Sequence, residues 1–76
     1  MAGGWRVQTQ LHQRWDDVFT ADHITLHPLD VCVDVAKYWG KVYRRVRVVG
    51  PPANGRNPYA VHARINDGQV EYTRRS

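Results

Sequence analysis

The sequence predicts a single small α+β domain, with one helix packed on one face of an antiparallel sheet of four to five strands, in the order β-β-α-β-β-β. Three observations support this: apolar and polar residues alternate over Trp5–Leu11, Pro28–Trp39 is amphipathic, and two alternating segments flank Asn66–Gly68. With 76 residues the chain is one domain at most. A domain of this size buries only about 60% of the surface that its unfolded chain exposes, so its core is expected to be thin.

The first two strands form a predicted hairpin. Trp5–Leu11 (WRVQTQL) places its odd-numbered residues on one face and Arg6, Gln8 and Gln10 on the other, as in a half-buried strand. His12–Arg14 is a plausible turn, and Trp15–Thr20 is a weaker second strand.

The segment from residue 29 to residue 41 is ambiguous. Its LDVCVDV stretch alternates with a period of two, which favours a strand. Its charged residues have helical spacing and would form one exposed stripe: Asp30, Asp34, Lys37 and Lys41. Pro28 suits the first helical position and Gly40 a C-terminal cap. The helical interpretation prevails over Pro28–Trp39, with Cys32 and Ala36 turned inward.

The C-terminal half continues the sheet. Val42–Val49 is a predicted strand with Val46 and Val48 on one face and Arg45 and Arg47 on the other. Gly50–Pro58 is a predicted loop, since its prolines and Asn-Gly cannot continue a ladder. If Asp67 and Gly68 form a type I′ turn, the last two strands pair in one register: Asn66 with Gln69, Ile65 with Val70, Arg64 with Glu71, and Ala63 with Tyr72.

Alternation assigns a face to each side chain. The inner face would collect Val46, Val48, Tyr59, Val61, Ala63, Ile65, Val70 and Tyr72. The outer face would collect Arg45, Arg47, His62, Arg64, Glu71 and Thr73. A single helix cannot cover both faces, so the outer face is expected to be open to solvent.

The charge is unevenly distributed along the chain. Residues 1–36 carry a net charge of −3 and residues 37–76 a net charge of +7. A basic half favours an anionic partner, although arginines alternating along a strand are also ordinary solvated residues. The candidate binding residues are Tyr43, Arg44, Arg45, Arg47, Arg56, His62, Arg64, Arg74 and Arg75.

Two groups of residues have the composition of chemical sites, and each also has a structural explanation. His62, Arg64 and Glu71 could perform acid–base chemistry on RNA, but Arg64 and Glu71 are equally explained as a cross-strand pair. His23 and His27 have the spacing of metal ligands, with Asp30 and Cys32 following, but Pro28 interrupts any helix that would carry both histidines. We therefore expect no catalytic residue, no metal and no cofactor.

The cysteine count and the lack of long apolar runs predict where in the cell the protein is located. Cys32 is the only cysteine, so the chain forms no internal disulfide. No apolar run has the length of a signal peptide or of a membrane span. The expectation is a soluble cytoplasmic protein without a membrane partner.

The start GWRVQTQLHQRW, with an amphipathic helix leading into VYRRVRVV, resembles small accessory proteins of phages and mobile elements, including some anti-CRISPR proteins. The resemblance implies a non-enzymatic inhibitor that binds a host protein or nucleoprotein complex and blocks its binding of nucleic acid. That class often presents acidic surfaces that mimic DNA, and the basic C-terminal half departs from this pattern. The alternatives are a small protein that binds DNA or RNA directly, and a ribonuclease toxin of a toxin–antitoxin pair.

Overall fold

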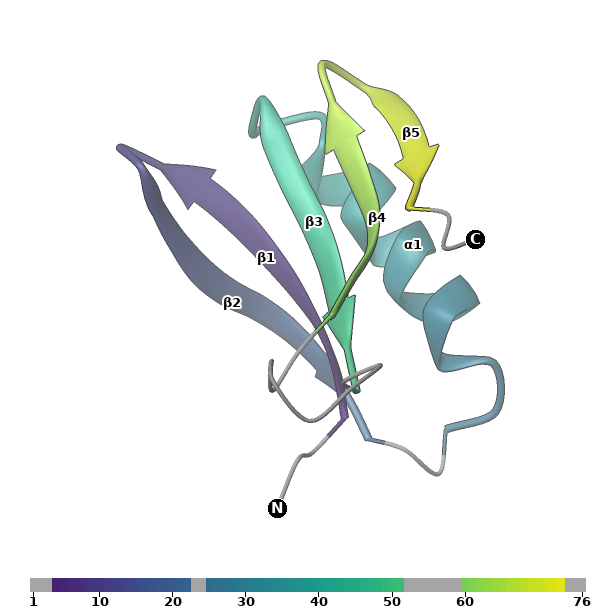
Figure 1. Ribbon diagram of the computed structural model, residues 1–76. Helices are drawn as coiled ribbons and strands as arrows, with labels where there is room; N and C mark the ends of the chain where they lie inside the picture. Colours follow the sequence, from purple (N-terminus) through teal and green to yellow (C-terminus); the bar gives the residue numbers. More distant parts are fainter. Residues whose placement is uncertain (1–3, 23–24, 52–59, 74–76) are drawn as a thin grey trace.

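The structure is a computed structural model that describes residues 4–22, 25–51 and 60–73. Its elements follow the predicted order: β1 (Trp5–Leu11), β2 (Arg14–Ala21), α1 (Pro28–Trp39), β3 (Arg45–Gly50), β4 (Ala60–Asn66) and β5 (Gln69–Tyr72). The strands form one antiparallel sheet in the order β2-β1-β3-β4-β5, and α1 packs against one face of it (Figure 1). The predicted fold class is confirmed. Most of the predicted Gly50–Pro58 loop lies outside the described residues, as does Tyr59.

The helix has the predicted bounds. Pro28 opens it, Asp30 lies in its first turn and Lys37 in its last, which suits the helix dipole. The charged stripe is exposed, whereas Cys32 and Ala36 are fully buried. The valines that suggested a strand therefore serve an apolar helical face.

Gly40 is the C-terminal cap residue of α1, as predicted, but its backbone conformation is not the one that usually favours glycine there. Its backbone is right-handed, with φ −64° and ψ −14°, so it does not form the left-handed cap that favours glycine. A Cβ atom at this position would lie only 2.8 Å from Cγ2 of Ile65. Glycine is therefore suited to Gly40 because the end of α1 approaches β4 closely.

The core lies between α1 and the inner face of the sheet. Its buried members are Val7, Ala21, Cys32, Val33, Ala36, Val46, Val48, Ala63 and Ile65. The helix packs mainly on β1 and β3 and less on β2 and β4, which leaves β5 at the margin. Tyr72, expected in the core, consequently remains 60% exposed.

The predicted C-terminal hairpin is confirmed in its register. Arg64 is directly opposite Glu71 and Ala63 opposite Tyr72. Both turn residues are left-handed, with φ 51° at Asp67 and 84° at Gly68, as a type I′ turn requires.

The strand before this hairpin begins later than predicted, at Arg45 instead of Val42. The amide groups of Val42 and Tyr43 each donate to the carbonyl oxygen of Trp39 at 2.9 Å, so the chain still turns there at the end of α1. Val42 is accordingly 70% exposed.

Two β-bulges interrupt the alternation of the sheet. Between β1 and β2, Val7 pairs with Phe19 but Gln8 pairs with Asp17, so Val18 is an extra residue. Between β3 and β4 the extra residue is His62. An extra residue moves the side chains beyond it to the opposite face. Strict alternation assigned His62 to the outer face and Val61 to the inner face, and the bulge makes both assignments wrong.

Candidate anion-binding face

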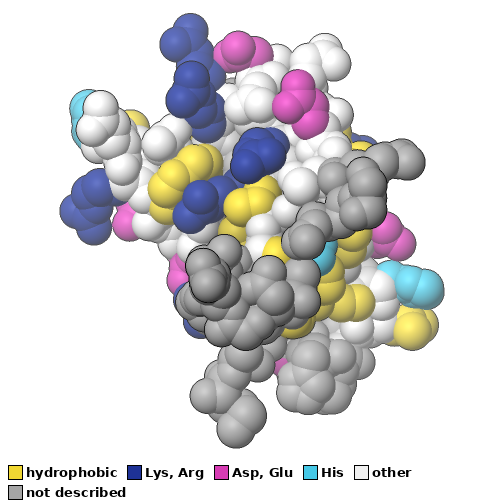
Figure 2. All heavy atoms as spheres, in the orientation of Figure 1, with side chains coloured by type: hydrophobic (Ala, Val, Ile, Leu, Met, Phe, Trp, Pro, Cys, Tyr) yellow, Lys and Arg dark blue, Asp and Glu magenta, His cyan; other side chains and the backbone are white. Residues whose placement is uncertain are grey.

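No helix or strand that the structure describes covers the side of the sheet away from α1, and this side faces the viewer in Figure 1. Dark-blue Lys and Arg side chains gather over its upper half, with apolar surface between them (Figure 2). On strands β1 to β4 this outer face includes the following alternating side chains: Gln8, Gln10, Trp15, Asp17, Arg45, Arg47, Arg64 and Asn66. The predicted arginine surface is therefore formed.

Two arginines of this face oppose each other. Arg47 and Arg64 are paired positions on β3 and β4, and Arg45 follows on the same side of β3. Like charges directly opposite one another destabilise a sheet. Burial lowers the pKa of Arg47, the charge of Arg64 lowers it further, and Asp17 raises it. An anion bound between Arg47 and Arg64 would relieve this repulsion.

Arg47 is also held in a fixed orientation. Its Nε donates to Oε1 of Gln8 at 2.7 Å, and its guanidinium carbon lies 4.1 Å from the centroid of the Trp15 ring. Nε2 of Gln8 donates to Oδ1 of Asp17 at 2.8 Å, and Oδ2 of Asp17 accepts from Nη1 of Arg6 at 2.9 Å. This chain of contacts fixes the guanidinium plane against the indole.

The face is hollowed around these side chains. A concavity of about 450 Å³ is lined by residues that include Gln10, Trp15, Arg45, Arg47, Arg64 and Asn66. Its volume lies within the range of small-ligand sites, roughly 300–1,000 Å³. Arg44 also lines it, and its Nε lies 3.2 Å from Oδ1 of Asp67 in an exposed ion pair.

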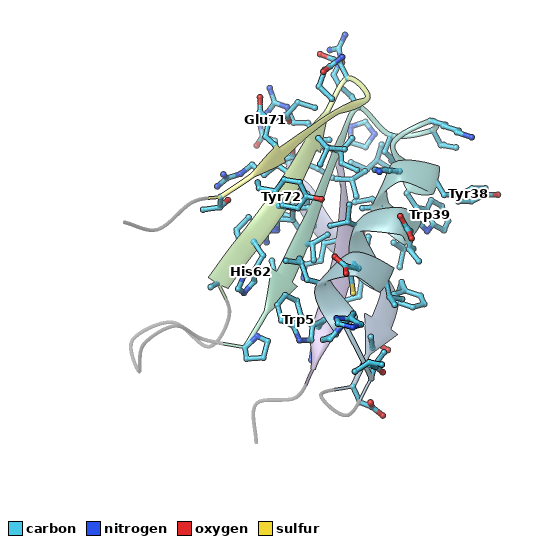
Figure 3. All side chains as sticks on the ribbon, turned by 90° about the vertical axis from the view of Figure 1, so that its right-hand side faces the viewer. Trp5, Tyr38, Trp39, His62, Glu71 and Tyr72 are labelled. Carbon is cyan, nitrogen blue, oxygen red and sulfur yellow. The ribbon has the colours of Figure 1, made fainter. Side chains whose placement is uncertain are left out.

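His62 does not belong to the outer face. Its ring centroid lies 4.4 Å from that of Trp5, and Nε2 is buried without a hydrogen-bond partner among the described residues. Figure 3 shows His62 near Trp5 at the foot of the sheet, whereas Glu71 lies on the side away from α1. The predicted cluster of His62, Arg64 and Glu71 is not formed, because His62 is the bulge residue.

Tyr43 was also placed wrongly. It packs against the core, with its ring centroid 5.9 Å from that of Trp39. The alternation of β3 does not extend to Tyr43, because the strand begins only at Arg45.

Arg64 and Glu71 are opposed as predicted, but their side chains bind other partners. Nη1 of Arg64 donates to Oγ1 of Thr73 at 3.4 Å, and Nδ2 of Asn66 donates to Oε1 of Glu71 at 3.3 Å. Among the predicted binding residues, Arg56, Arg74 and Arg75 lie outside the described residues, and their role stays a prediction.

Sequence reasoning missed Trp15 as a member of the face. The turn at His12 and Gln13 has two residues, so Leu11 pairs with Arg14 and Gln10 with Trp15. Gln10 was already expected to face outward. Counting back from a two-residue turn would therefore have placed Trp15 beside the arginines.

The described residues contain no group of three or more potential metal ligands. Cys32, one of the residues considered as possible metal ligands, is fully buried, and burial raises the pKa of its thiol to about 11. His23, another member, lies outside the described residues. No helix in the described segments is long and apolar enough to cross a membrane.

Comparison of the chain with protein-family models, with curated proteins and with solved structures gave no match. The function is therefore argued from the outer face.

Proposed function

We propose that this protein is a non-enzymatic cytoplasmic binding module whose outer face binds the phosphate backbone of a nucleic acid. The observation that carries the proposal is the opposition of Arg47 and Arg64, with Arg45 beside them, on a face that α1 leaves uncovered. Contact with phosphates needs positive charge within reach of the backbone and no further specificity. Folding has brought three cations together, and an external anion would relieve the repulsion between Arg47 and Arg64 that Asp17 offsets only in part.

The proposal is tested by a matched pair of double variants. Arg45→Ala with Arg64→Ala removes two charges from the outer face, and both side chains are exposed. Lys37→Ala with Lys41→Ala removes the same net charge from exposed positions, one in the last turn of α1 and one just after the helix. Arg47 is left in place because it also contacts Gln8 and Trp15.

The readout is the affinity for a labelled single-stranded oligonucleotide, measured at several salt concentrations. We expect the arginine pair to weaken binding about tenfold or more at low salt and to reduce the salt slope by roughly 1.4, which corresponds to two lost phosphate contacts on a single strand. The lysine pair should change neither quantity much. Equal effects of the two pairs would show that only net charge matters, and no binding by the wild-type protein would reject the proposal.

A second candidate is the inhibitor suggested by the resemblance to phage accessory proteins, which would bind a host nucleoprotein complex and block its nucleic-acid site. One observation favours it: Asp17 of β2 lies on the same face as the arginines and acts electrostatically on Arg47, and Glu71 of β5 is directly opposite Arg64. Carboxylates repel phosphates, whereas a mixed surface can complement a protein of mixed charge. Capture of a host complex that survives nuclease treatment and is lost in the Arg45→Ala, Arg64→Ala variant would favour this candidate.

A further inference from the structure

The hollow in the outer face has two features that phosphate binding does not require. A backbone contact needs only cations on an accessible surface. Here the cations surround a concavity of about 450 Å³, and an indole forms part of its lining. An aromatic ring among arginines is the arrangement on which unpaired bases stack.

The stacking partner is already oriented. The guanidinium of Arg47 lies over the Trp15 ring at 4.1 Å, and its hydrogen bond to Gln8 keeps it there. Both the indole and the guanidinium plane are surfaces on which splayed bases stack in protein complexes with single strands. Trp15 is half-buried and comes from β2, while Arg47 comes from β3. The two together present a platform inside the hollow.

Polar groups suited to a base edge line the same hollow. Gln10 lies beside Trp15 and Asn66 beside Arg45, as paired positions on neighbouring strands. A carboxamide supplies both a donor and an acceptor, so it can meet the edge of any base. Arg45 and Arg64 flank this lining and are placed for the adjoining phosphates.

From these observations we infer that the outer face recognises single-stranded nucleic acid, with one unpaired base inserted into the hollow beside Trp15 and Arg47. The inference rests on the proposed function and narrows its ligand class. A paired base inside a duplex has neither face free for the platform. A duplex can therefore use only the arginines, and a single strand uses the arginines and the hollow together.

The test compares three probes of equal length, about twelve nucleotides: oligothymidine, its duplex with oligoadenosine, and an abasic strand with the same phosphates. The wild-type protein should bind oligothymidine about tenfold more tightly than the abasic strand, with the duplex near the abasic value. Trp15→Ala should remove this difference by weakening oligothymidine binding about tenfold while leaving the abasic affinity unchanged. The matched control is Tyr38→Ala, which removes a 64% exposed aromatic side chain from α1 and should change no affinity.

Tryptophan fluorescence gives an independent readout, because Trp15→Phe removes the indole emission but keeps an aromatic ring in the hollow. Oligothymidine should quench the emission of the wild-type protein and of the Trp39→Phe variant. The quenching should be lost in Trp15→Phe, because Trp39 packs on the core side of the sheet and only Trp15 lies in the hollow. The thermal transition of each variant shows whether it is folded.

The outcomes separate the inference from the proposed function. If all three probes bind equally, or if Trp15→Ala weakens them equally, the base does not enter the hollow and the inference is wrong, while phosphate binding by the face stands. If the wild-type protein binds none of the probes, both are wrong. Quenching that persists in Trp15→Phe would also overturn the inference.

Discussion

Gly50 offers a direct test of how the Trp5 side chain of β1 packs on the neighbouring strand β3. The indole of Trp5 lies on this glycine so closely that a Cβ atom would meet Cε3, Cζ3 and Cδ2 at 2.6, 2.7 and 2.8 Å. Gly50 is not among the described residues with positive φ, so alanine fits the backbone and the conflict is purely steric. Overpacking of this kind costs typically about 1–3 kcal/mol. In a domain of this size, Gly50→Ala should lower Tm by roughly 4–8 °C for each kcal/mol.

The same substitution should change sign when the indole is removed. In a Trp5→Leu background the six-membered ring is absent, and Gly50→Ala should become neutral or stabilising by about 0.4–1 kcal/mol, because alanine restricts the unfolded chain. Urea denaturation of the four proteins gives the coupling energy as a double-mutant cycle. An unchanged cost of Gly50→Ala in the Trp5→Leu background would refute the packing argument.

Gly68→Ala serves as the control for this cycle. Gly68 has φ 84° and open space where a Cβ would lie, so its replacement is destabilising through the backbone alone. Its cost should be the same with Trp or with Leu at position 5. Coupling between Gly68 and Trp5 would show that the cycle reports a general loss of stability and not a local contact.

Two further predictions concern the interior of the domain. Ala36→Asp should destabilise the protein by roughly 3 kcal/mol or more, because it places an unpaired charge at a fully buried position. Lys37→Ala, at the exposed neighbouring position, should hardly change stability. Similar thermal shifts for the two variants would reject the helical packing. Since burial raises the pKa of the Cys32 thiol from 9.0 to about 11, its contribution to stability is complete below pH 9 and lost as the pH rises toward 11. In Cys32→Ala that part of the alkaline loss should be absent from denaturation curves, and an identical pH dependence would contradict the assignment.

Local patterns were sufficient to predict the helix and the last hairpin. Pro28 and the spacing of the charged residues fixed α1, since both depend only on neighbours along the chain. Asp67-Gly68 determined the hairpin register because the turn itself demands two left-handed residues. In both places the information lies within a dozen residues, which is why the sequence alone contains it.

Features that depend on distant packing were not predictable in the same way. Whether Tyr72 is buried depends on how far α1 reaches across the sheet, and the helix stops short of β5. Gly40 is explained by its distance from Ile65, which lies in a different element. Neither contact can be predicted from the residues next to Tyr72 or Gly40 in the sequence.

The two bulges decide the composition of the candidate site. Along β2, Trp15 and Phe19 are four residues apart, and strict alternation would place them on the same face. The extra residue Val18 separates them, so Phe19 joins the core while Trp15 joins the arginines. On β4 the extra residue His62 leaves the outer face in the same manner, and its ring contacts that of Trp5 at an interplanar angle of 44°. One bulge thus places the Trp15 ring beside the arginines, and the other removes His62 from their face. The proposed binding function therefore depends on the positions of these two inserted residues.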